Sequence, residues 1–294
     1  MVILSRGKCG LSKCITRYLV AMAAADLMVV IVVALLDQTN MIHKYSRLLI
    51  ITPICALTSV LRVATTGCSV WLTVAFTFDR FIAICCQQLQ IRYCSERTAT
   101  VVIVVVTILC CARCIPVYFA IEPYSIIDHV PWGCIFIAGY YTSSMWKAFE
   151  LIDSILTPLL PIALILLFNG LTVRHIIAAN RVRQSLRNNS ENQKDPEVEN
   201  RRKSMVLLFA LSANFILLWM PYVVSSVNWQ TQNYFYTDRY MSNPTYILQQ
   251  LGFMFKFLST CTNTCIYILS QRKFREDLKK GVKFVLTLNG HCCK

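Results

Sequence analysis

Residues 101–106 read Val101-Val102-Ile103-Val104-Val105-Val106, and they lie inside a longer apolar run at about 98–121. β-Branched side chains are poor helix formers in water. In the core of a bilayer no water is available for an exposed backbone, so a spanning segment satisfies its own backbone as a helix. We therefore interpret this run as a transmembrane helix.

Five further apolar runs accompany it. About 20 apolar residues are enough to cross a bilayer as a helix, and this chain of 294 residues is 56% hydrophobic with a mean hydropathy of +0.52. A buried core helix could explain one such run, but not six in series. The sequence predicts an all-α transmembrane helix bundle with spans at about 17–36, 51–78, 98–121, 149–173, 204–228 and 246–269.

Lysine and arginine are distributed unevenly around these spans. The formal net charge is +14, and most basic residues lie in the first 17 residues, in the connections near 82–97 and 174–203, and after residue 270. The positive-inside rule makes these segments cytoplasmic, which places both ends of the chain in the cytosol. The basic charge is then explained without a nucleic-acid partner.

The sequence predicts a membrane domain, 1–269, and a short cytoplasmic tail, 270–294. In the tail, apolar residues at helical spacing alternate with Lys and Arg, which is typical of an amphipathic helix on the inner membrane surface. Cys292 and Cys293 near its end are either palmitoylated or free. Residues 5–10 read as a cytoplasmic hairpin between two helices, so we expect a further helix before them and an N-terminally truncated sequence.

Three short patterns occur in order within these spans: Asp79-Arg80-Phe81, Trp219-Met220-Pro221, and Asn263 with Tyr267 four residues later. Together they resemble the transmembrane motifs of the rhodopsin-like (class A) G-protein-coupled receptors, over almost the whole chain. A weaker resemblance is to the group of orphan receptors 139 and 142. The resemblance implies a multi-pass plasma-membrane receptor that binds an extracellular small molecule or peptide and activates a heterotrimeric G protein.

The resemblance also implies roles for single residues. The G-protein switch comprises Asp79, Arg80, Phe81, Asn263 and Tyr267, and the toggle beneath the ligand comprises Phe215, Trp219 and Pro221. Phe81 replaces the usual tyrosine and Thr264 replaces the usual proline of the last motif. Arg201 and Arg202 lie where the family often has an acid, so we expect Asp79 alone to restrain Arg80. Pro161 is expected to kink the fourth span, while Asn169 replaces a usual tyrosine.

Asp26 lies in the middle of the first span. A carboxylate in a bilayer core is costly and indicates function by default. One interpretation is a protonated acid satisfied by neighbouring helices. The other follows from the family, whose corresponding aspartate binds a sodium ion together with the residues matching Ser69, Ser259 and Asn263.

Pocket and disulfide positions follow from the same resemblance. The predicted ligand pocket comprises Arg62, Thr66, Asp153, Tyr222, Phe253 and Lys256. Arg62 stands where amine receptors have an aspartate. Its charge, with those of Lys256, Glu150 and Asp153, indicates either mutual pairing, such as Arg62 with Asp153, or a pocket for an amino acid or a peptide end. Topology leaves Cys55, Cys134 and Cys114 on the oxidising side, and the family pairs Cys55 with Cys134.

Two other functions stay open at this point. Intramembrane charges and six spans would suit a transporter, although no internal repeat is visible. A non-signalling receptor fragment is the second alternative. No catalytic, metal or phosphate-loop constellation is present in the sequence, so we do not expect an enzyme.

Overall fold

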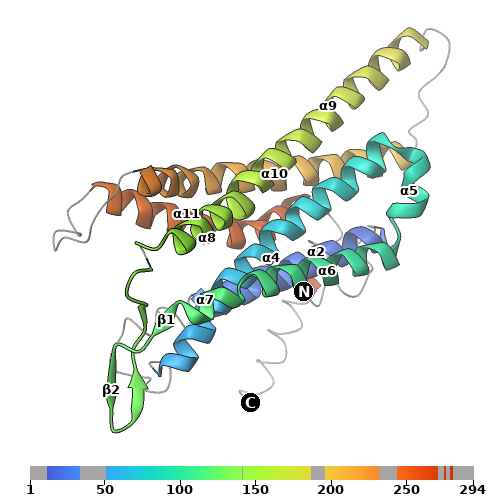
Figure 1. Cartoon of the computed structure of the whole chain (residues 1–294). Coiled ribbons are helices and arrows are strands. Elements are labelled where there is room, and N and C mark those ends of the chain that lie inside the picture. The colour runs from blue at the N-terminus through green and yellow to red at the C-terminus, as the bar shows by residue number, and fades with distance from the viewer. Residues whose placement is uncertain are drawn as a thin grey trace, which may run out of the picture.

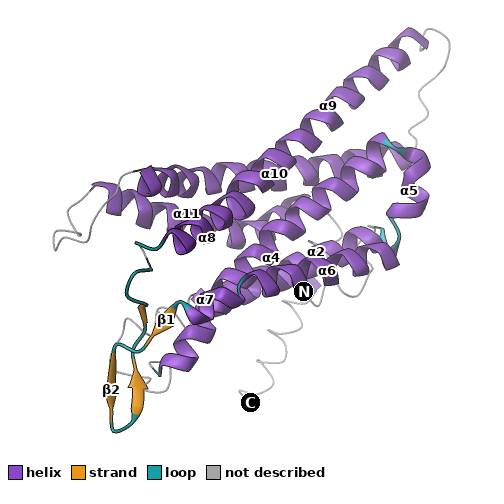
Figure 2. Ribbon diagram, in the orientation of Figure 1, coloured by secondary structure: helices purple, strands orange, loops and turns teal. Residues whose placement is uncertain are grey.

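The computed structural model describes residues 12–33, 51–140, 142–186, 196–231, 244–270, 275 and 279–280. Within this part of the chain, long helices form a bundle, and short β-strands lie at one end of it (Figures 1 and 2). The predicted all-α bundle is therefore confirmed, with strands that the sequence did not predict. The predicted amphipathic tail helix and the Cys292-Cys293 pair lie almost wholly outside the described residues.

The helices in chain order are α2 (Lys13–Val30), α4 (Thr52–Cys85), α5 (Gln87–Tyr93), α6 (Glu96–Arg113), α7 (Ile115–Phe119), α8 (Ser144–Ser154), the π-helical turn η3 (Ile155–Leu159), α9 (Leu160–Leu186), α10 (Pro196–Thr231) and α11 (Pro244–Ser270). Between α7 and α8 lie β1 (Ile121–Glu122), β2 (Ser125–Ile127), β3 (Val130–Trp132) and β4 (Ile135–Phe136). β1 pairs with β4 and β2 with β3, both antiparallel.

Local sequence explains several helix ends. Ser12 begins α2 and Ser95 begins α6, each accepting a hydrogen bond at its side-chain oxygen from a backbone N–H three residues on. A proline in the first turn starts α4 and again α7, where its missing N–H costs nothing. The third span is thus two helices, α6 and α7, joined at Cys114.

Five segments of the described chain are long and apolar enough to cross a membrane: Lys13–Val33, Thr52–Cys85, Glu96–Phe119, Ser144–Val182 and Met205–Asn228. They match the first five predicted spans in order. The second runs beyond its predicted end at 78, because Asp79 and Arg80 are buried within the bundle. The sixth predicted span, 246–269, lies within α11, and its crossing of the membrane stays a prediction.

Helix α4 is the centre of the bundle and contacts α2, α6, α9 and α10, while α11 lies along α10 and also touches α2 (Figure 1). One core cluster joins α2, α4, α6 and α10 around the fully buried Phe76. A second joins α4, α9 and α10 around Trp219. By contrast, α6 turns apolar side chains such as Val101 and Leu109 outward, as expected of a helix that faces lipid.

The irregular turn of the fourth span is not at Pro161, where the sequence placed a kink. The helix widens one turn earlier, at η3, where the Leu160 N–H bonds the Ile155 carbonyl five residues back. Pro158 lies inside this turn, and Pro161 falls in the first turn of α9. Two prolines lacking an N–H leave adjacent turns short of hydrogen bonds, so the distortion is shared between them.

Candidate functional site

A cavity of about 340 Å³ lies between α4, α7, α8, α10, α11 and β4. This volume is within the usual range for small-molecule and cofactor pockets. The sequence-predicted pocket residues come together here, because all six line the cavity: Arg62, Thr66, Asp153, Tyr222, Phe253 and Lys256.

Lys256 points across the aromatic wall of this cavity. Its Nζ lies 4.5 Å from the ring centre of Tyr222, 5.3 Å from that of Trp219 and 5.8 Å from that of Phe253. Such cation–π contacts stabilise a charge that has left bulk water. Gly252, one turn before Lys256, permits this approach, because a Cβ there would come within 2.9 Å of the Tyr222 Cα.

Asp153 does not pair with Arg62, the partner that the sequence suggested. Its Oδ1 atom instead forms a salt bridge with Arg113 Nη1, at 2.9 Å. Arg113 also donates to Thr157 Oγ1 at 2.8 Å. Gly67 makes room for this arginine, since a Cβ there would lie 2.9 Å from Arg113 Nη2. Sequence reasoning missed Arg113, although a charge at the end of an apolar run was a visible signal.

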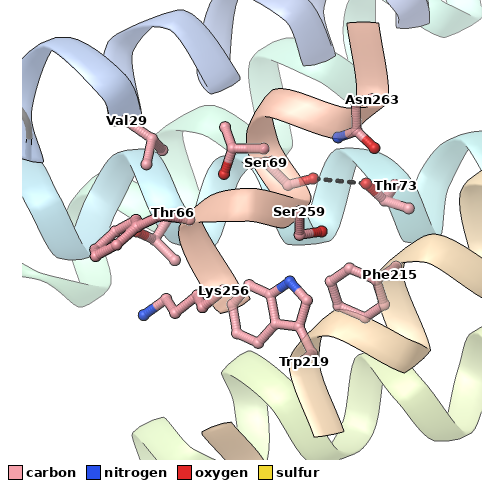
Figure 3. A pocket seen from close by; sticks show the side chains of 11 residues that line it. Val29, Thr66, Ser69, Thr73, Phe215, Trp219, Lys256, Ser259 and Asn263 are labelled. Carbon is pink, nitrogen blue, oxygen red and sulfur yellow. Dashed lines mark hydrogen bonds between the residues drawn. The ribbon is translucent and has the colours of Figure 1, made fainter. Parts of the chain in front are cut away.

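Trp219 and Phe215 lie below the cavity in a tilted ring contact, with ring centres 5.1 Å apart. Beyond them lies a second, much smaller cavity of about 10 Å³, roughly the room for one water molecule. Figure 3 shows Trp219 and Phe215 on one side of it and Ser69 and Asn263 on the other. Thr66 and Lys256 line both cavities, so the two spaces adjoin.

The carboxylate of Asp26 is the centre of a buried polar network. Ser69 Oγ donates to Asp26 Oδ1 at 2.6 Å, and Asn263 Nδ2 donates to Asp26 Oδ2 at 2.9 Å. Asn214 Nδ2 in turn donates to Asn263 Oδ1 at 3.3 Å, a link that the sequence did not suggest. Ser259, the fourth predicted member, is buried and lines the small cavity. The structure therefore brings these four residues together.

This donor set fits a small hard cation. A carboxylate and serine hydroxyls present oxygen atoms, which such cations prefer as ligands. The same network also satisfies Asp26 without an ion, so both interpretations of this carboxylate fit its surroundings. An ion held here would supply a positive charge that neutralises the buried carboxylate.

At the opposite end of α4, Asp79 and Arg80 are both about 5% exposed and form a salt bridge through Asp79 Oδ2. Arg80 is therefore buried beside its neighbour rather than extended to the interface. The structure adds a partner that the sequence did not indicate: Cys14 Sγ donates to Asp79 Oδ1 at 3.2 Å. Phe81 stacks on Phe168 of α9, with ring centres 5.7 Å apart. The side chains of Tyr267, Arg201 and Arg202 lie outside the described set.

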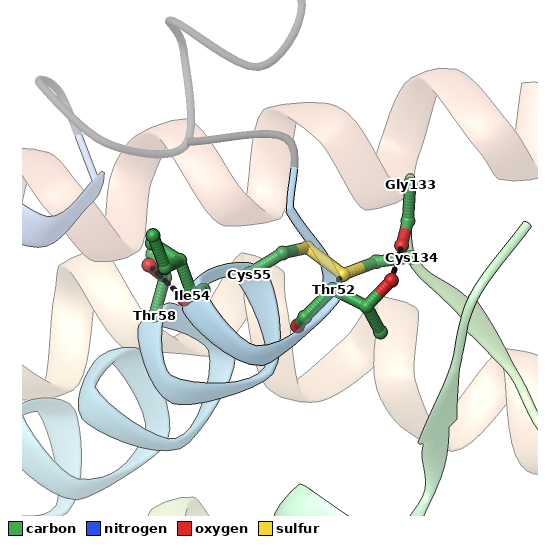
Figure 4. Close-up of a disulfide and its surroundings, with 6 residues drawn as sticks. All are labelled: Thr52, Ile54, Cys55, Thr58, Gly133 and Cys134. Carbon is green, nitrogen blue, oxygen red and sulfur yellow. Dashed lines mark hydrogen bonds between the residues drawn. A yellow bond between two sulfur atoms is a disulfide. The ribbon is translucent and has the colours of Figure 1, made fainter. Parts of the chain in front are cut away.

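The predicted disulfide between Cys55 and Cys134 is present, with Cα atoms 6.3 Å apart (Figure 4). Thr52 Oγ1 reinforces it by donating to the Gly133 carbonyl at 2.7 Å. The bond fixes the loop that carries β4 to the start of α4. Two residues that follow Cys134 in this loop, Phe136 and Tyr140, line the large cavity.

The structure is a helix bundle with a charged cavity beside a loop that a disulfide ties down. A buried carboxylate network lies below the cavity, and an acid–arginine pair lies at the far end. This combination is that of a multi-pass membrane receptor. The family model described as 7 transmembrane receptor (rhodopsin family) matches residues 1–267, and the chain belongs to that family. This membership confirms the predicted class of protein, a receptor rather than an enzyme. The narrower resemblance to orphan receptors 139 and 142 stays a prediction.

Two curated relatives are similar at low identity. The B2 bradykinin receptor of Rattus norvegicus is 23% identical over 176 residues, which is 59% of this chain and 41% of that receptor. The B2 bradykinin receptor of Mus musculus is 24% identical over 178 residues, or 60% of this chain and 42% of the relative. The match thus spans about two-fifths of the length of each relative.

Proposed function

We propose that this chain is a plasma-membrane receptor that binds an extracellular ligand in the 340 Å³ cavity and activates a heterotrimeric G protein in the cytosol. In this proposal both ends of the chain lie on the cytosolic side, as the distribution of Lys and Arg suggests. The observation that carries the proposal is the run of contacts from Lys256 to Trp219 to Phe215. It connects the ligand cavity with the smaller cavity and the Asp26 network, so a ligand that moves Trp219 would disturb both.

The chemistry of the cavity favours a ligand that carries charge and an aromatic or apolar group. Its wall combines basic and acidic side chains with aromatic rings. The curated relatives are bradykinin receptors, which supports a peptide as the ligand class. An amino acid carries the same charged groups on a smaller scale and is the second candidate.

We further propose that the Asp26 network binds a sodium ion, with Asp26, Ser69, Ser259 and Asn263 around it. The support is twofold: Ser69 and Asn263 hydrogen-bond the Asp26 carboxylate across three helices, and a small cavity lined by Ser69, Ser259 and Asn263 lies beside this network. The ion would hold α2, α4 and α11 together beside Trp219.

In this proposal, the Asp79–Arg80 pair controls coupling of the receptor to the G protein. Arg80 is buried against Asp79, so a G protein gains access to the guanidinium only when that pair opens. Separating a buried ion pair without a substitute is costly. The pair therefore sets the basal activity.

The test is nucleotide exchange on purified G proteins by the chain in lipid nanodiscs, without ligand and with bradykinin or L-amino acids added. We expect Arg80→Ala to abolish exchange and the exposed Arg97→Ala to leave it unchanged. Exchange that persists in Arg80→Ala would show that this arginine is not the switch. If the wild-type protein promoted nucleotide exchange under none of these conditions but transported labelled amino acids, the receptor proposal would give way to a transporter.

A further inference from the structure

Four acidic or basic side chains of Asp, Glu, Lys or Arg line the large cavity: the basic Arg62 and Lys256, and the acidic Glu150 and Asp153. Equal numbers of each sign suggest at first a neutral pocket in which acids and bases pair. The contacts show a different arrangement, because both acids are bound by groups other than these two bases.

Asp153 is held by Arg113, which approaches from α6 and does not itself line the cavity. The contact is short, 2.9 Å, and the same Nη1 atom also bonds Thr157 Oγ1. Arg113 is enclosed near Gly67 and cannot turn away freely. The charge of Asp153 is therefore neutralised from behind the cavity wall.

Glu150 is held by Tyr140. The two side chains are hydrogen-bonded. Tyr140 is 7% exposed and is fixed by stacking on Phe136 and by a tilted ring contact with Trp146. Burial and the nearby Glu150 raise the pKa of the Tyr140 hydroxyl. The phenol thus stays protonated at neutral pH and serves as the donor.

The two basic side chains of the cavity, Arg62 and Lys256, are not paired with these acids. Among the described residues, neither Arg62 nor Lys256 forms a salt bridge with an acid. Both side chains line the same cavity, Arg62 from α4 and Lys256 from α11. Two cations that share a cavity repel each other, and an anion between them removes that repulsion.

We infer that Arg62 and Lys256 form an anion subsite that holds a carboxylate of the ligand, either the C-terminus of a peptide or the carboxyl group of an amino acid. This inference rests on the cavity being the ligand site of the proposed function. Arg62 offers a planar fork of donors that matches a carboxylate. Lys256 brings the same anion next to Trp219, so recognition of the carboxylate and movement of the toggle occur at one place.

The experiment compares four probes that share an indole ring: indole-3-propionate, tryptophan, tryptamine and tryptophanamide. The melting temperature of the purified chain in detergent is measured against the concentration of each. We expect the two carboxylates to stabilise the protein and the two compounds without a carboxylate to leave it unchanged. The subsite would be overturned if tryptamine stabilised the protein as much as indole-3-propionate does. It would also be overturned if none of the four probes changed the melting temperature.

Variants assign the effect to the two bases. We expect Arg62→Gln and Lys256→Gln each to raise the half-saturating concentration of indole-3-propionate by about tenfold or more, because a charge-assisted hydrogen bond is lost. Lys147→Gln, the same charge change at an exposed position of α8, is the matched control and should not alter it. Lys256→Arg keeps the charge and should retain binding, which separates loss of the charge from a folding defect. Identical titrations for all variants would refute the assignment.

These experiments distinguish a failure of the anion subsite from a failure of the proposed receptor function. Anion binding without any nucleotide exchange leaves the subsite in place and rejects the receptor function. Exchange that depends on Arg80, with no preference for carboxylates, rejects the subsite alone.

Discussion

Cys14 Sγ lies 3.2 Å from Asp79 Oδ1, and this contact joins the start of α2 to the acid of the Asp79–Arg80 pair. Both residues are buried, at 2% and 5% exposure. The other carboxylate oxygen accepts hydrogen bonds from Arg80. The thiol is a weak donor, but it fixes the carboxylate in the orientation that faces the guanidinium.

Cys14→Ala should raise ligand-independent nucleotide exchange. Hydrogen bonds to charged groups contribute about 1.5–3 kcal/mol, and a thiol is at the weak end of that range, so we expect an increase of roughly tenfold. Cys14→Ser keeps a donor at nearly the same place and should stay close to the wild type. Equal basal exchange in all three proteins would show that the thiol does not restrain the pair.

Asp26→Asn should remove any dependence of stability on sodium. The melting temperature of the wild-type chain is expected to rise when choline chloride is replaced by sodium chloride at constant ionic strength. An amide has no charge to bind the ion, although it preserves the size of the side chain. A wild-type melting temperature that is the same in both salts would contradict the sodium proposal.

Gly252→Ala and Gly170→Ala should have opposite effects. An alanine Cβ at 252 would meet the Tyr222 backbone at 2.9 Å, and such overpacking typically costs about 1–3 kcal/mol. At Gly170, on α9, nothing lies within 4 Å, so the better helix propensity of alanine should stabilise by about 0.5–1 kcal/mol. Thermal melting of both variants is the measurement. Equal melting temperatures would mean that α10 and α11 pack less tightly than described.

Cys134→Ala should lower both stability and probe binding. The Cys55–Cys134 bond closes a separation of 79 residues, and loss of a native disulfide of this loop size typically costs about 2–5 kcal/mol. It also frees the loop that carries Phe136 and Tyr140, and with it the partner of Glu150. The exposed free cysteine Cys111 provides the control variant, Cys111→Ala. A melting temperature that matches this control would contradict the predicted role.

The resemblance to the receptor family supplied the pocket residues, the disulfide and the members of the Asp26 network, because the family motifs fix the register of each span in the sequence. It did not identify their partners on other helices. Arg113, Cys14 and Asn214 act through contacts that depend on how far each helix is rotated against its neighbour. Hydrophobic periodicity fixes that rotation only coarsely when lipid, and not a polar solvent, surrounds the bundle.

The β-strands and η3 were missed for a different reason. The strands are two or three residues long, too short for a period-two pattern to show in the sequence. The widened turn at Ile155–Leu159 results from two prolines acting together, whereas each proline alone predicts a kink at its own position.

Helix α9 extends well beyond the rest of the bundle, at the upper right of Figure 1. Its 27 residues are about 40 Å long at 1.5 Å per residue, more than the hydrocarbon thickness of a bilayer. The widened turn η3 at its start lies beside the ligand cavity, through Thr157, and is the natural pivot for a tilt of so long a helix. A tilt of about 10° at that pivot would sweep the free end through roughly 7 Å, so a sub-ångström adjustment around Thr157 becomes a displacement that a bound cytosolic protein would register.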